Sequence, residues 1–369
     1  MMSEKLALSV LCGGQSAEHE ISIRSACNVL AAFDPSRYDL SVVYIDPQGV
    51  WHRISDVPAF VQQSPQVLVK QKKTDPLYIV FGNPHHPWRS HCYPDRHYRV
   101  DCTFPLIHGT YGEDGAMQGL LDLLQVPYIG ADTQSSACCM EKDVAKRLLR
   151  AANLPTPDWH VLYPSSNLEG VYTRLVEQWG EPHLFIKPAS LGSSIGVALV
   201  HNEAEFPSAV KTAFRFDDRV LVEPRINGRE IECSVLGNGD PKASLPGEFI
   251  HNAEYYSYEA KYISEDTQLM APATLSPSVT AQIQQFAVAA FKALHCTGMA
   301  RVDFFLKKDG SIMINELNTI PGFTSGSLYP KLWEVSGLSY SDLLDQLVAL
   351  ALERHQRQGQ LIRSYPNRP

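Results

Sequence analysis

Apolar residues in the first part of the chain fall into short runs that alternate with longer amphipathic stretches. The runs at 6–12, 40–46 and 101–107 are typical of buried strands, because they are short, apolar and separated by more polar segments. The stretches at 21–33 and 116–125 repeat apolar residues at helical spacing. Strands that alternate with helices predict parallel βα units and an α/β fold.

This alternation stops at residues 52–98, which are interrupted by Pro, His and Gln and show no clear periodicity. We expect this segment to be a long loop or an irregular excursion from the sheet. A helix predicted to end at Pro155 then begins a second unit, and two strands flank a predicted turn at Asn227-Gly228. We divide the chain into three units, at residues 1–140, 141–230 and 231–369.

Composition bounds the class of protein. The 369 residues are 44% hydrophobic and 20% charged, as in soluble globular proteins, and the formal charge of −8 gives no reason to expect a nucleic-acid partner. The eight cysteines show no CxxC spacing, so neither a zinc cage nor a disulfide framework is indicated. A reducing compartment is the simpler interpretation. The run at 6–12 is too short for a membrane span and lacks a basic leader, so we expect a cytoplasmic protein without a membrane partner.

A glycine- and serine-rich loop at 187–197 is the first candidate for chemistry. It follows a predicted strand that ends at Lys187, and glycines let backbone N–H groups approach phosphate oxygens while the lysine supplies positive charge. The loop does not match the GxxxxGK[ST] pattern, because its lysine precedes the glycines. Taken alone, it is equally well interpreted as a flexible hairpin turn.

A predicted hairpin at 298–318 is the second candidate. A two-residue turn at 309–310 would place Asp303 directly opposite Glu316 on one face. Two facing carboxylates repel each other by about 1 kcal/mol in water and by ~4 kcal/mol near a protein surface. We therefore expect a cation between them.

The same register predicts that Arg301 faces Asn318, which shares a strand face with Glu316. Carboxylate and amide oxygens are hard metal ligands, and three such residues are too few to complete the coordination of calcium. A magnesium ion that keeps waters and binds phosphate oxygens fits this set best. A solvated acidic face of the hairpin is the alternative.

Seven motifs, in order along almost the whole chain, resemble those of the ATP-grasp superfamily and, within it, the D-alanine:D-alanine ligases. The motifs are GGQSAEHEISIRS (13–25), HGTYGEDGAMQG (108–119), MEKDVAKRLL (140–149), KPASLGSSIGV (187–197), YSYEAKYISEDTQ (256–268), GMARVDFF (298–305) and NELNTIPGFTSGSLYP (315–330). The resemblance implies an ATP-grasp fold. The three units would be a Rossmann-like substrate-binding domain, a central ATP-binding subdomain, and a C-terminal catalytic subdomain with a metal site and a lid loop.

The resemblance also implies an activity: ATP-dependent, ADP-forming ligation of two D-alanines for peptidoglycan precursor synthesis. ATP would convert the carboxylate of the first D-alanine to an acyl phosphate, which the amino group of the second would attack. Two alternatives stay open. One is an ATP-grasp ligase with D-serine or D-lactate as second substrate, and the other is a non-catalytic nucleotide-binding protein on the same fold. A homodimer is also implied.

The residues that the resemblance assigns to ATP are lysines, serines and residues of a hinge strand. They are Lys142, Lys187, Ser193, Ser194, Glu223, Ile226, Glu230 and Lys261. Glu223 and the backbone of Ile226 would bind the adenine edge, and Glu230 would accept hydrogen bonds from the ribose. The implied ligands for two Mg²⁺ or Mn²⁺ ions are Asp303, Glu316 and Asn318.

The resemblance assigns the reaction centre to five residues. They are Glu18, Ser193, Tyr262, Arg301 and Gly322. Arg301 would stabilise the transferring phosphoryl group and the oxyanion, with help from the backbone N–H of Gly322. Glu18 would anchor the ammonium of the first D-alanine and join Ser193 and Tyr262 in a link that closes the lid. An acid in the first turn of a helix also complements the helix dipole, which is the alternative for Glu18.

The remaining predicted substrate contacts are Ser327, Leu328 and His108. Ser327 and Leu328 begin a predicted short helix, whose free N–H groups would bind the carboxylate of the second D-alanine. Structural capping by Ser327 is the alternative. His108 lies at the C-terminal end of a predicted strand, where α/β sites form. Tyr262 favours an amine nucleophile, because relatives that use D-lactate typically carry histidine there.

Overall fold

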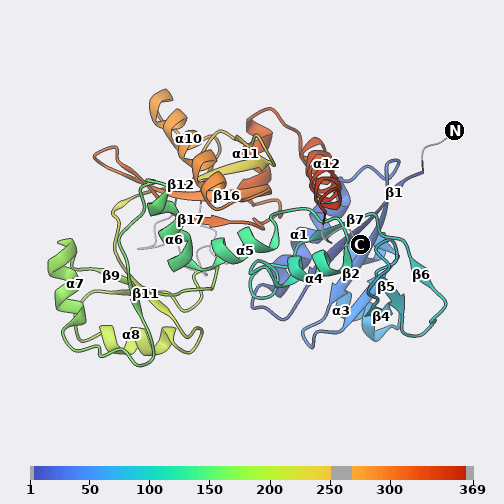
Figure 1. Cartoon of the computed structure of the whole chain (residues 1–369), viewed down its shortest axis with the longest axis horizontal. Helices are drawn as coiled ribbons and strands as arrows, with labels where there is room; N and C mark the ends of the chain where they lie inside the picture. Colours follow the sequence, from blue (N-terminus) through green and yellow to red (C-terminus); the bar gives the residue numbers. More distant parts are fainter. Residues whose placement is uncertain (1–3, 251–267, 363–369) are drawn as a thin grey trace, which may run out of the picture.

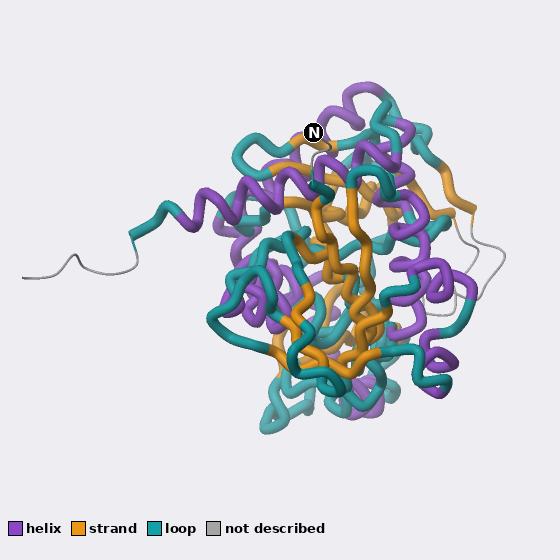
Figure 2. The backbone as a smooth tube through the Cα atoms, turned by 90° about the vertical axis from the view of Figure 1, so that its right-hand side faces the viewer, coloured by secondary structure: helices purple, strands orange, loops and turns teal. Residues whose placement is uncertain are grey.

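The computed structural model describes residues 4–250 and 268–362, which form three β-sheets with helices packed on them. Figure 1 shows the N-terminal sheet at one end, a small sheet at the other end, and the C-terminal sheet between them. In Figure 2, the C-terminal end of the last helix projects beyond the body of the molecule. No helix in the described ranges is both long enough and apolar enough to cross a membrane.

The N-terminal sheet has seven strands in the order β6-β5-β4-β3-β2-β1-β7. Its central strand β1 (Leu6–Gly13) pairs in parallel with β2 (Tyr38–Ile45) and with β7 (Cys102–Pro105), as predicted from the alternating pattern. Helix α1 (His19–Ala32) connects β1 to β2 and packs on β1, and α4 (Ala116–Leu124) follows β7. Nearly all of β1 is buried, which explains its continuous apolar run.

The prediction of a long loop or irregular excursion at residues 52–98 was wrong. The segment continues the sheet with antiparallel strands and adds two short helices. These elements are β3 (Trp51–Ile54), α2 (Val57–Gln62), α3 (Pro65–Lys70), β4 (Asp75–Ile79), β5 (Trp88–Ser90) and β6 (His97–Tyr98). The strands are two to five residues long, too short for an alternating pattern to stand out among prolines and histidines.

The small sheet has four antiparallel strands in the order β10-β9-β11-β8. The strands are β8 (His160–Leu162), β9 (Leu184–Pro188), β10 (Ala198–Val200) and β11 (Val220–Pro224). Helices α7 (Val171–Trp179) and α8 (Phe206–Ala213) belong to the core of this sheet, whereas α5 (Thr133–Met140) and α6 (Lys142–Ala151) contribute to the core of the C-terminal sheet. β9 and β10 pair directly, so the glycine- and serine-rich loop connects the two strands of a hairpin.

The C-terminal sheet has the order β15-β14-β12-β16-β17, with β13 paired to β12. Its strands are β12 (Gly228–Gly237), β13 (Lys242–Ala243), β14 (Gly247–Ile250), β15 (Gln268–Met270), β16 (Gly298–Lys307) and β17 (Ile312–Asn318). The helices are α10 (Pro277–Ala293), α11 (Leu328–Val335) and α12 (Tyr340–Gly359). The predicted boundary at 230/231 falls inside β12, and the division into three domains stays a prediction.

The turn between β16 and β17 differs from the prediction. Lys307 N donates to Ser311 O at 2.9 Å, so three residues rather than two lie between the last hydrogen-bonded residues, Lys307 and Ser311. Gly310 closes this turn at φ +84°, a left-handed conformation that suits a residue without Cβ. The longer turn shifts the register by one residue near the hairpin end.

A β-bulge restores the predicted register at the other end of the same hairpin. Phe304 pairs with Ile314, but Asp303 pairs with Glu316, so Asn315 is the extra residue of the bulge. The predicted pairing of Asp303 with Glu316 is therefore present, although the turn length from which it was argued was wrong. The two one-residue departures cancel.

Helix α12 is last in sequence but packs on the first sheet. Its buried residues Leu343, Leu344 and Leu347 belong to the same apolar core as Leu8 and Val10 of β1. This packing brings the C-terminal part of the chain back to the N-terminal sheet. It helps to place the segments from β17 to α11 beside α1.

Candidate functional site

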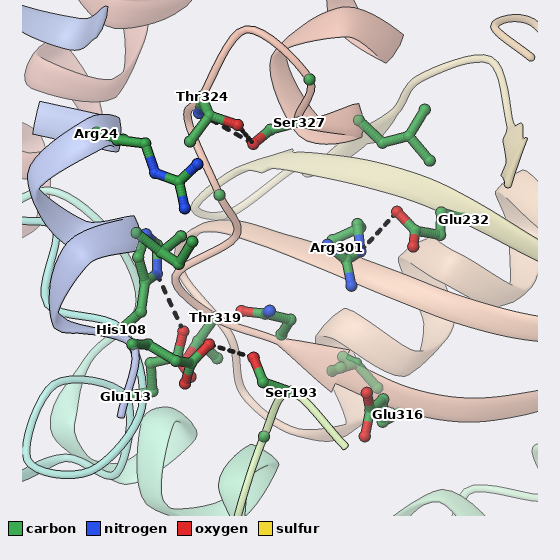
Figure 3. Close-up of a pocket in the computed structure, with 18 of the residues that line it drawn as sticks. Arg24, His108, Glu113, Ser193, Glu232, Arg301, Glu316, Thr319, Thr324 and Ser327 are labelled. Carbon is green, nitrogen blue, oxygen red and sulfur yellow. Dashed lines mark hydrogen bonds and ion pairs between the residues drawn. The ribbon is translucent and has the colours of Figure 1, made fainter. Parts of the chain in front are cut away.

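Two neighbouring cavities, of about 540 and 380 Å³, lie between the sheets. The larger is lined by residues of α1, β17, α11 and the loops after β7 and β17, and the smaller by residues of β9, β11, β12 and β16. They share wall residues that include Lys142, Ser193 and Glu316. Figure 3 shows the polar side chains of the larger cavity coming from separate elements toward a common space.

A buried cluster of charges lies at the back of the smaller cavity. Lys187 Nζ donates to Glu223 Oε2 at 2.8 Å, and Lys146 Nζ lies 3.1 Å from Glu223 Oε1. Burial opposes ionisation of Glu223, but the two ammonium groups outweigh it and lower the pKa of Glu223 to about 2. Burial likewise opposes the charge on Lys187, and Glu223 nevertheless raises the pKa of that lysine. Glu223 and Lys187 are therefore both charged at neutral pH.

The glycine- and serine-rich loop is held by Lys142, the first residue of α6. Lys142 Nζ donates to Leu191 O at 2.6 Å and lies 3.7 Å from Glu316 Oε2. Within the loop, Ser193 and Ser194 have φ of +52° and +56°, which is unusual for residues with a side chain and costs on the order of 1 kcal/mol each. The loop has a specific conformation, so the interpretation as a plain flexible turn is not favoured.

The hinge residues predicted to bind adenosine line the smaller cavity. Ile226 and Glu230 do so together with Glu223 and Lys187. The connection from β11 to β12 thus presents backbone and carboxylate groups to the space that Lys187 also faces. This is the arrangement expected of a nucleotide site, with the base at the hinge and the phosphates at the lysines.

Arg301 lies in a network of acids on the C-terminal sheet. Its guanidinium donates to both carboxylate oxygens of Asp303 at 2.7 Å, and its Nε lies 2.9 Å from Glu232 Oε2 (Figure 3). Burial opposes the charge, but Asp303 and Glu232 raise the pKa of Arg301 well above its usual range. The arginine is thus fixed in the wall of the larger cavity as a permanent positive charge.

The three predicted metal ligands occupy neighbouring positions on β16 and β17. Asp303 faces Glu316 across the strands, and Asn318 shares a face with Glu316. Asn318 Oδ1 accepts a hydrogen bond from Ile320 N at 3.1 Å. This bond orients the amide and leaves the second lone pair of Oδ1 for another partner. No three His, Cys, Asp or Glu side chains among the described residues form a metal-ligand group, and this set contains only two carboxylates. Its hard oxygens fit a magnesium or manganese ion that also binds phosphate and water.

Glu18 and Ser193, predicted to act together, meet across the larger cavity. Ser193 Oγ donates to Glu18 Oε1, which links the glycine- and serine-rich loop to the start of α1. Glu18 is the N-cap of α1 rather than a first-turn residue, and its carboxylate makes no capping bond to the helix in the described part of the chain. Only 6% of Glu18 is exposed. At the N-cap, Glu18 also lies at the positive end of the helix dipole, so the alternative that it complements the dipole stays open beside its bond to Ser193.

His108 is buried and contacts two segments that lie far apart in the sequence. Its Nδ1 lies 3.1 Å from Ile320 O and 3.5 Å from Glu113 Oε1, and its Nε2 lies 3.0 Å from Ser25 Oγ. Burial opposes protonation, but Glu113 outweighs it and raises the pKa of His108. His108 also lines the larger cavity, so it can position the loop at Ile320 and contact a substrate.

The segment after β17 brings Gly322, Ser327 and Leu328 to the larger cavity. A Cβ on Gly322 would lie 2.6 Å from Ser327 Oγ, so no larger residue fits without a shift. Ser327 is the N-cap of α11, but its Oγ accepts a hydrogen bond from Thr324 N at 2.9 Å and, within the described residues, caps no helix N–H. The structural capping by Ser327 that was the alternative is thus replaced by a loop contact.

The last two predicted site residues are Lys261 and Tyr262, which lie outside the described residues.

Comparison with known proteins identifies the family. The family model described as the N-terminus of D-ala D-ala ligase matches residues 7–131, and the model of the C-terminus matches residues 148–349. Together they cover most of the chain. This chain belongs to the D-ala D-ala ligase family.

Individual D-ala D-ala ligases resemble the chain over nearly its full length. A D-alanine–D-alanine ligase of Coxiella burnetii is 55% identical, over 99% of this chain and 98% of the relative. The solved structure of the ligase from Coxiella burnetii matches with a TM-score of 0.90 and 53% identity, covering 98% of both chains. The predicted family and the predicted ATP-grasp fold are confirmed.

Two further solved structures of ligases also resemble the chain. The VanG D-Ala:D-Ser ligase of Enterococcus faecalis matches with a TM-score of 0.84 and 33% identity, covering 94% of this chain and 100% of the other. A D-alanine–D-alanine ligase of Bacillus anthracis complexed with ATP matches with a TM-score of 0.71 and 28% identity, covering 96% and 100%.

Sequence reasoning missed several members of this D-ala D-ala ligase site. Lys146 bonds Glu223, Glu232 pairs with Arg301, and Glu113 pairs with His108. Arg24 of α1 also lines the larger cavity, into which it points in Figure 3. A signal for Glu232 was present, because alternation along β12 places it on the same face as Glu230, two positions earlier.

Proposed function

We propose that the protein joins two D-alanines into D-alanyl-D-alanine, with conversion of ATP to ADP and phosphate, as a step of peptidoglycan precursor synthesis. The observation that carries this is the meeting of two groups of residues around one space. The link between Glu18 and Ser193 lies on one side, and Arg301 with its acidic partners lies on the other. A substrate held between them has an acid for its ammonium and an arginine for its carboxylate.

The chemistry needs an activated carboxylate, because a carboxylate and an amine do not condense at neutral pH. Phosphorylation by ATP forms a bond from a carboxylate oxygen to the γ-phosphorus and breaks the bond to ADP. The amine of the second D-alanine then attacks the carbonyl carbon, phosphate leaves, and the amine proton is lost. Lys142, Lys187 and Arg301 supply the positive charge that stabilises the phosphoryl oxygens, and the Gly322 N–H and Arg301 stabilise the oxyanion.

The metal ligands in this proposal are Asp303, Glu316 and Asn318, which would hold two Mg²⁺ or Mn²⁺ ions. These ions would neutralise charge on the ATP phosphates. Asn318 is already oriented by its bond to Ile320 N, which suits a ligand that must present its oxygen in one direction.

Nucleotide and acceptor occupy different ends of the site. The base lies at Glu223 and Ile226 and the ribose at Glu230, while Ser194 and Lys261 contact the phosphates. The carboxylate of the second D-alanine binds at Ser327 and Leu328, where the first N–H groups of α11 are free of intrahelical partners. His108 contacts the first substrate, and the role proposed for Tyr262 is to join Ser193 and Glu18 when the lid closes.

The test is D-alanine-dependent turnover by the purified full chain. We expect ADP release that requires D-alanine and not L-alanine, with one D-alanyl-D-alanine detected by mass spectrometry for each ADP. Arg301→Met should lower the rate about 100- to 1000-fold, since it removes an oxyanion-stabilising donor. Arg99→Met is the matched control, because Arg99 is an exposed arginine of the N-terminal region. ATP binding without D-alanine-dependent turnover would refute the proposal and favour a non-catalytic nucleotide-binding protein.

A second candidate function is ligation of D-alanine to D-serine or D-lactate. The similarity to the VanG D-Ala:D-Ser ligase favours keeping it. Reactions that contain D-alanine with an excess of D-serine or D-lactate, followed by mass spectrometry, distinguish the products. We expect D-alanyl-D-alanine to dominate, and a dominant mixed product would reverse the assignment.

The proposal extends to a cytoplasmic homodimer. Static light scattering of the purified chain at micromolar concentration tests the oligomer, and a monomer mass would remove that part of the proposal alone.

A further inference from the structure

Lys146 is a buried lysine behind the wall of the smaller cavity. Only 2% of the residue is exposed, and its Nζ lies 3.1 Å from Glu223 Oε1, 3.3 Å from Thr156 Oγ1 and 3.4 Å from Pro157 O. It also lies over the ring of Trp159, at 5.7 Å from the centroid. Among the described residues that line the cavity, Lys187 and Glu223 are present and Lys146 is not. Lys146 therefore does not contact a bound nucleotide directly, and Glu223 is the cavity residue that it contacts.

Glu223 is held from two sides by these lysines. Lys146 contacts Oε1, and Lys187 donates to Oε2 at 2.8 Å, so each carboxylate oxygen has one cationic partner. A carboxylate oxygen accepts two hydrogen bonds, which leaves Oε2 able to accept one more from the cavity. With Lys146 balancing the charge of Glu223, the charge of Lys187 remains available to phosphates.

An ionised carboxylate distinguishes purines by the group at position 6. It accepts a hydrogen bond from the amino group of adenine, but it repels the carbonyl oxygen of hypoxanthine or guanine, since two acceptors then face each other. This selection requires that Glu223 stay ionised and in place. The buried cation at Oε1 supports both conditions, because Lys187 alone pairs only Oε2 and leaves Oε1 buried without a cationic partner.

We propose that Lys146 is a positioning residue for base selection: by holding Glu223 as an ionised acceptor, it makes the smaller cavity select a 6-amino purine over a 6-oxo purine. This rests on the proposed function, which places the base of ATP at Glu223. The role differs from that of Lys187, which faces the cavity itself.

The experiment measures binding of ADP and of IDP to the full chain by calorimetry, with no turnover required. We expect the wild type to prefer ADP by about tenfold or more, the ratio typical of a hydrogen bond to a charged group. Lys146→Met should lose most of this preference through weaker ADP binding, while IDP binding changes less than about twofold. Lys146→Arg should keep most of the preference, because it preserves the charge. Lys211→Met, at an exposed lysine of α8, is the matched control and should leave both affinities unchanged.

A double variant separates positioning from a general structural role. If Lys146 acts through Glu223, Glu223→Gln should lose the ADP preference, and Lys146→Met should add nothing to the ratio in that background. The double variant also removes both buried charges of the pair, so it provides a reading if Lys146→Met alone does not fold. Equal losses of ADP and IDP binding in Lys146→Met, or an unchanged ratio, would overturn the inference. Absence of ADP binding in the wild type would instead refute the proposed function.

Discussion

Glu316 is the residue on which the metal proposal depends most. It faces Asp303, lines both cavities and lies 3.7 Å from Lys142 Nζ. Glu316→Gln keeps the shape and removes the charge, so we expect turnover to fall by about 100-fold or more, above the 10- to 100-fold typical of groups that only support metal ligands. The apparent Mg²⁺ requirement should rise as well. ADP release measured against Mg²⁺ concentration tests both.

The control for this variant is Glu177→Gln, the same substitution at an exposed position of α7. It should change neither turnover nor the Mg²⁺ dependence. Wild-type kinetics of Glu316→Gln at limiting Mg²⁺ would remove Glu316 from the ligand set.

Gly322 allows a second test at the level of one atom. In Gly322→Ala, the new Cβ lies 2.6 Å from Ser327 Oγ, so the loop must shift, and we expect a loss of about 1–3 kcal/mol in the free energy of unfolding. Adding Ser327→Ala removes the clashing atom and should recover most of that loss. Urea unfolding of the two variants and of Ser327→Ala alone measures the coupling.

Gly326→Ala is the matched control, because a Cβ there meets no atom within 4 Å and Gly326 does not have a positive φ. It should stay within about 0.5 kcal/mol of the wild type. A Gly322→Ala protein as stable as Gly326→Ala would show that the loop has room to adapt.

Partners of the predicted residues were harder to predict than the residues themselves. Glu18 and Arg301 were assigned from motifs, which name residue types in order along the chain. Glu232 contacts Arg301 because β12 pairs with β16, and Lys146 contacts Glu223 because of how its helix packs. A buried counter-charge has no local signature, because its position depends on which elements become neighbours.

At the scale of elements, the hairpin of β16 and β17 carries a local sign of its bulge. The buried residues of β17 are Ile312, Ile314 and Leu317, so their spacing is two and then three. A strand keeps a spacing of two unless an extra residue is inserted. The spacing of these three apolar residues in the sequence therefore indicates the bulge at Asn315.

The bulge leads to a prediction about deletions. Removing Asn315 should preserve the faces of Ile314, Glu316 and Leu317, because the strand then alternates without interruption. We expect the melting temperature to stay within a few degrees of the wild type. Removing Met313 shortens the strand equally but turns Ile314 outward and Asn315 inward, which should cost about 2–5 kcal/mol. Thermal unfolding of both deletion variants compares them directly, and equal destabilisation would contradict the bulge argument.

At the scale of the molecule, His108 couples the N-terminal sheet to the segment after β17 through Ile320 O and Ser25. Burial lowers the pKa of His108, but Glu113 raises it by more, so the pKa is raised in the folded protein. The folded state therefore binds this proton more tightly than the unfolded state does. The resulting stabilisation is fully present below the unfolded pKa, about 6.5, and is lost as pH rises through the folded pKa.

We therefore predict that His108→Asn flattens the pH dependence of stability. The difference in free energy of unfolding between wild type and variant should shrink as pH rises from about 6 to about 9. Urea midpoints at several pH values measure it, and Glu113→Gln should flatten the profile in the same direction. A difference that grows with pH would contradict the raised pKa.

The sequence by itself determined the family, the alternation of parallel strands and helices, and the face shared by Glu316 and Asn318. These follow from residue types in order and from the periodicity of helices and strands, which are local properties. Only the tertiary structure decided that α12 packs on the first sheet, that Lys146 stabilises Glu223, and that residues 52–98 extend the sheet. Such contacts join segments far apart in the chain, and they depend on which packing buries the most apolar surface with every charge paired.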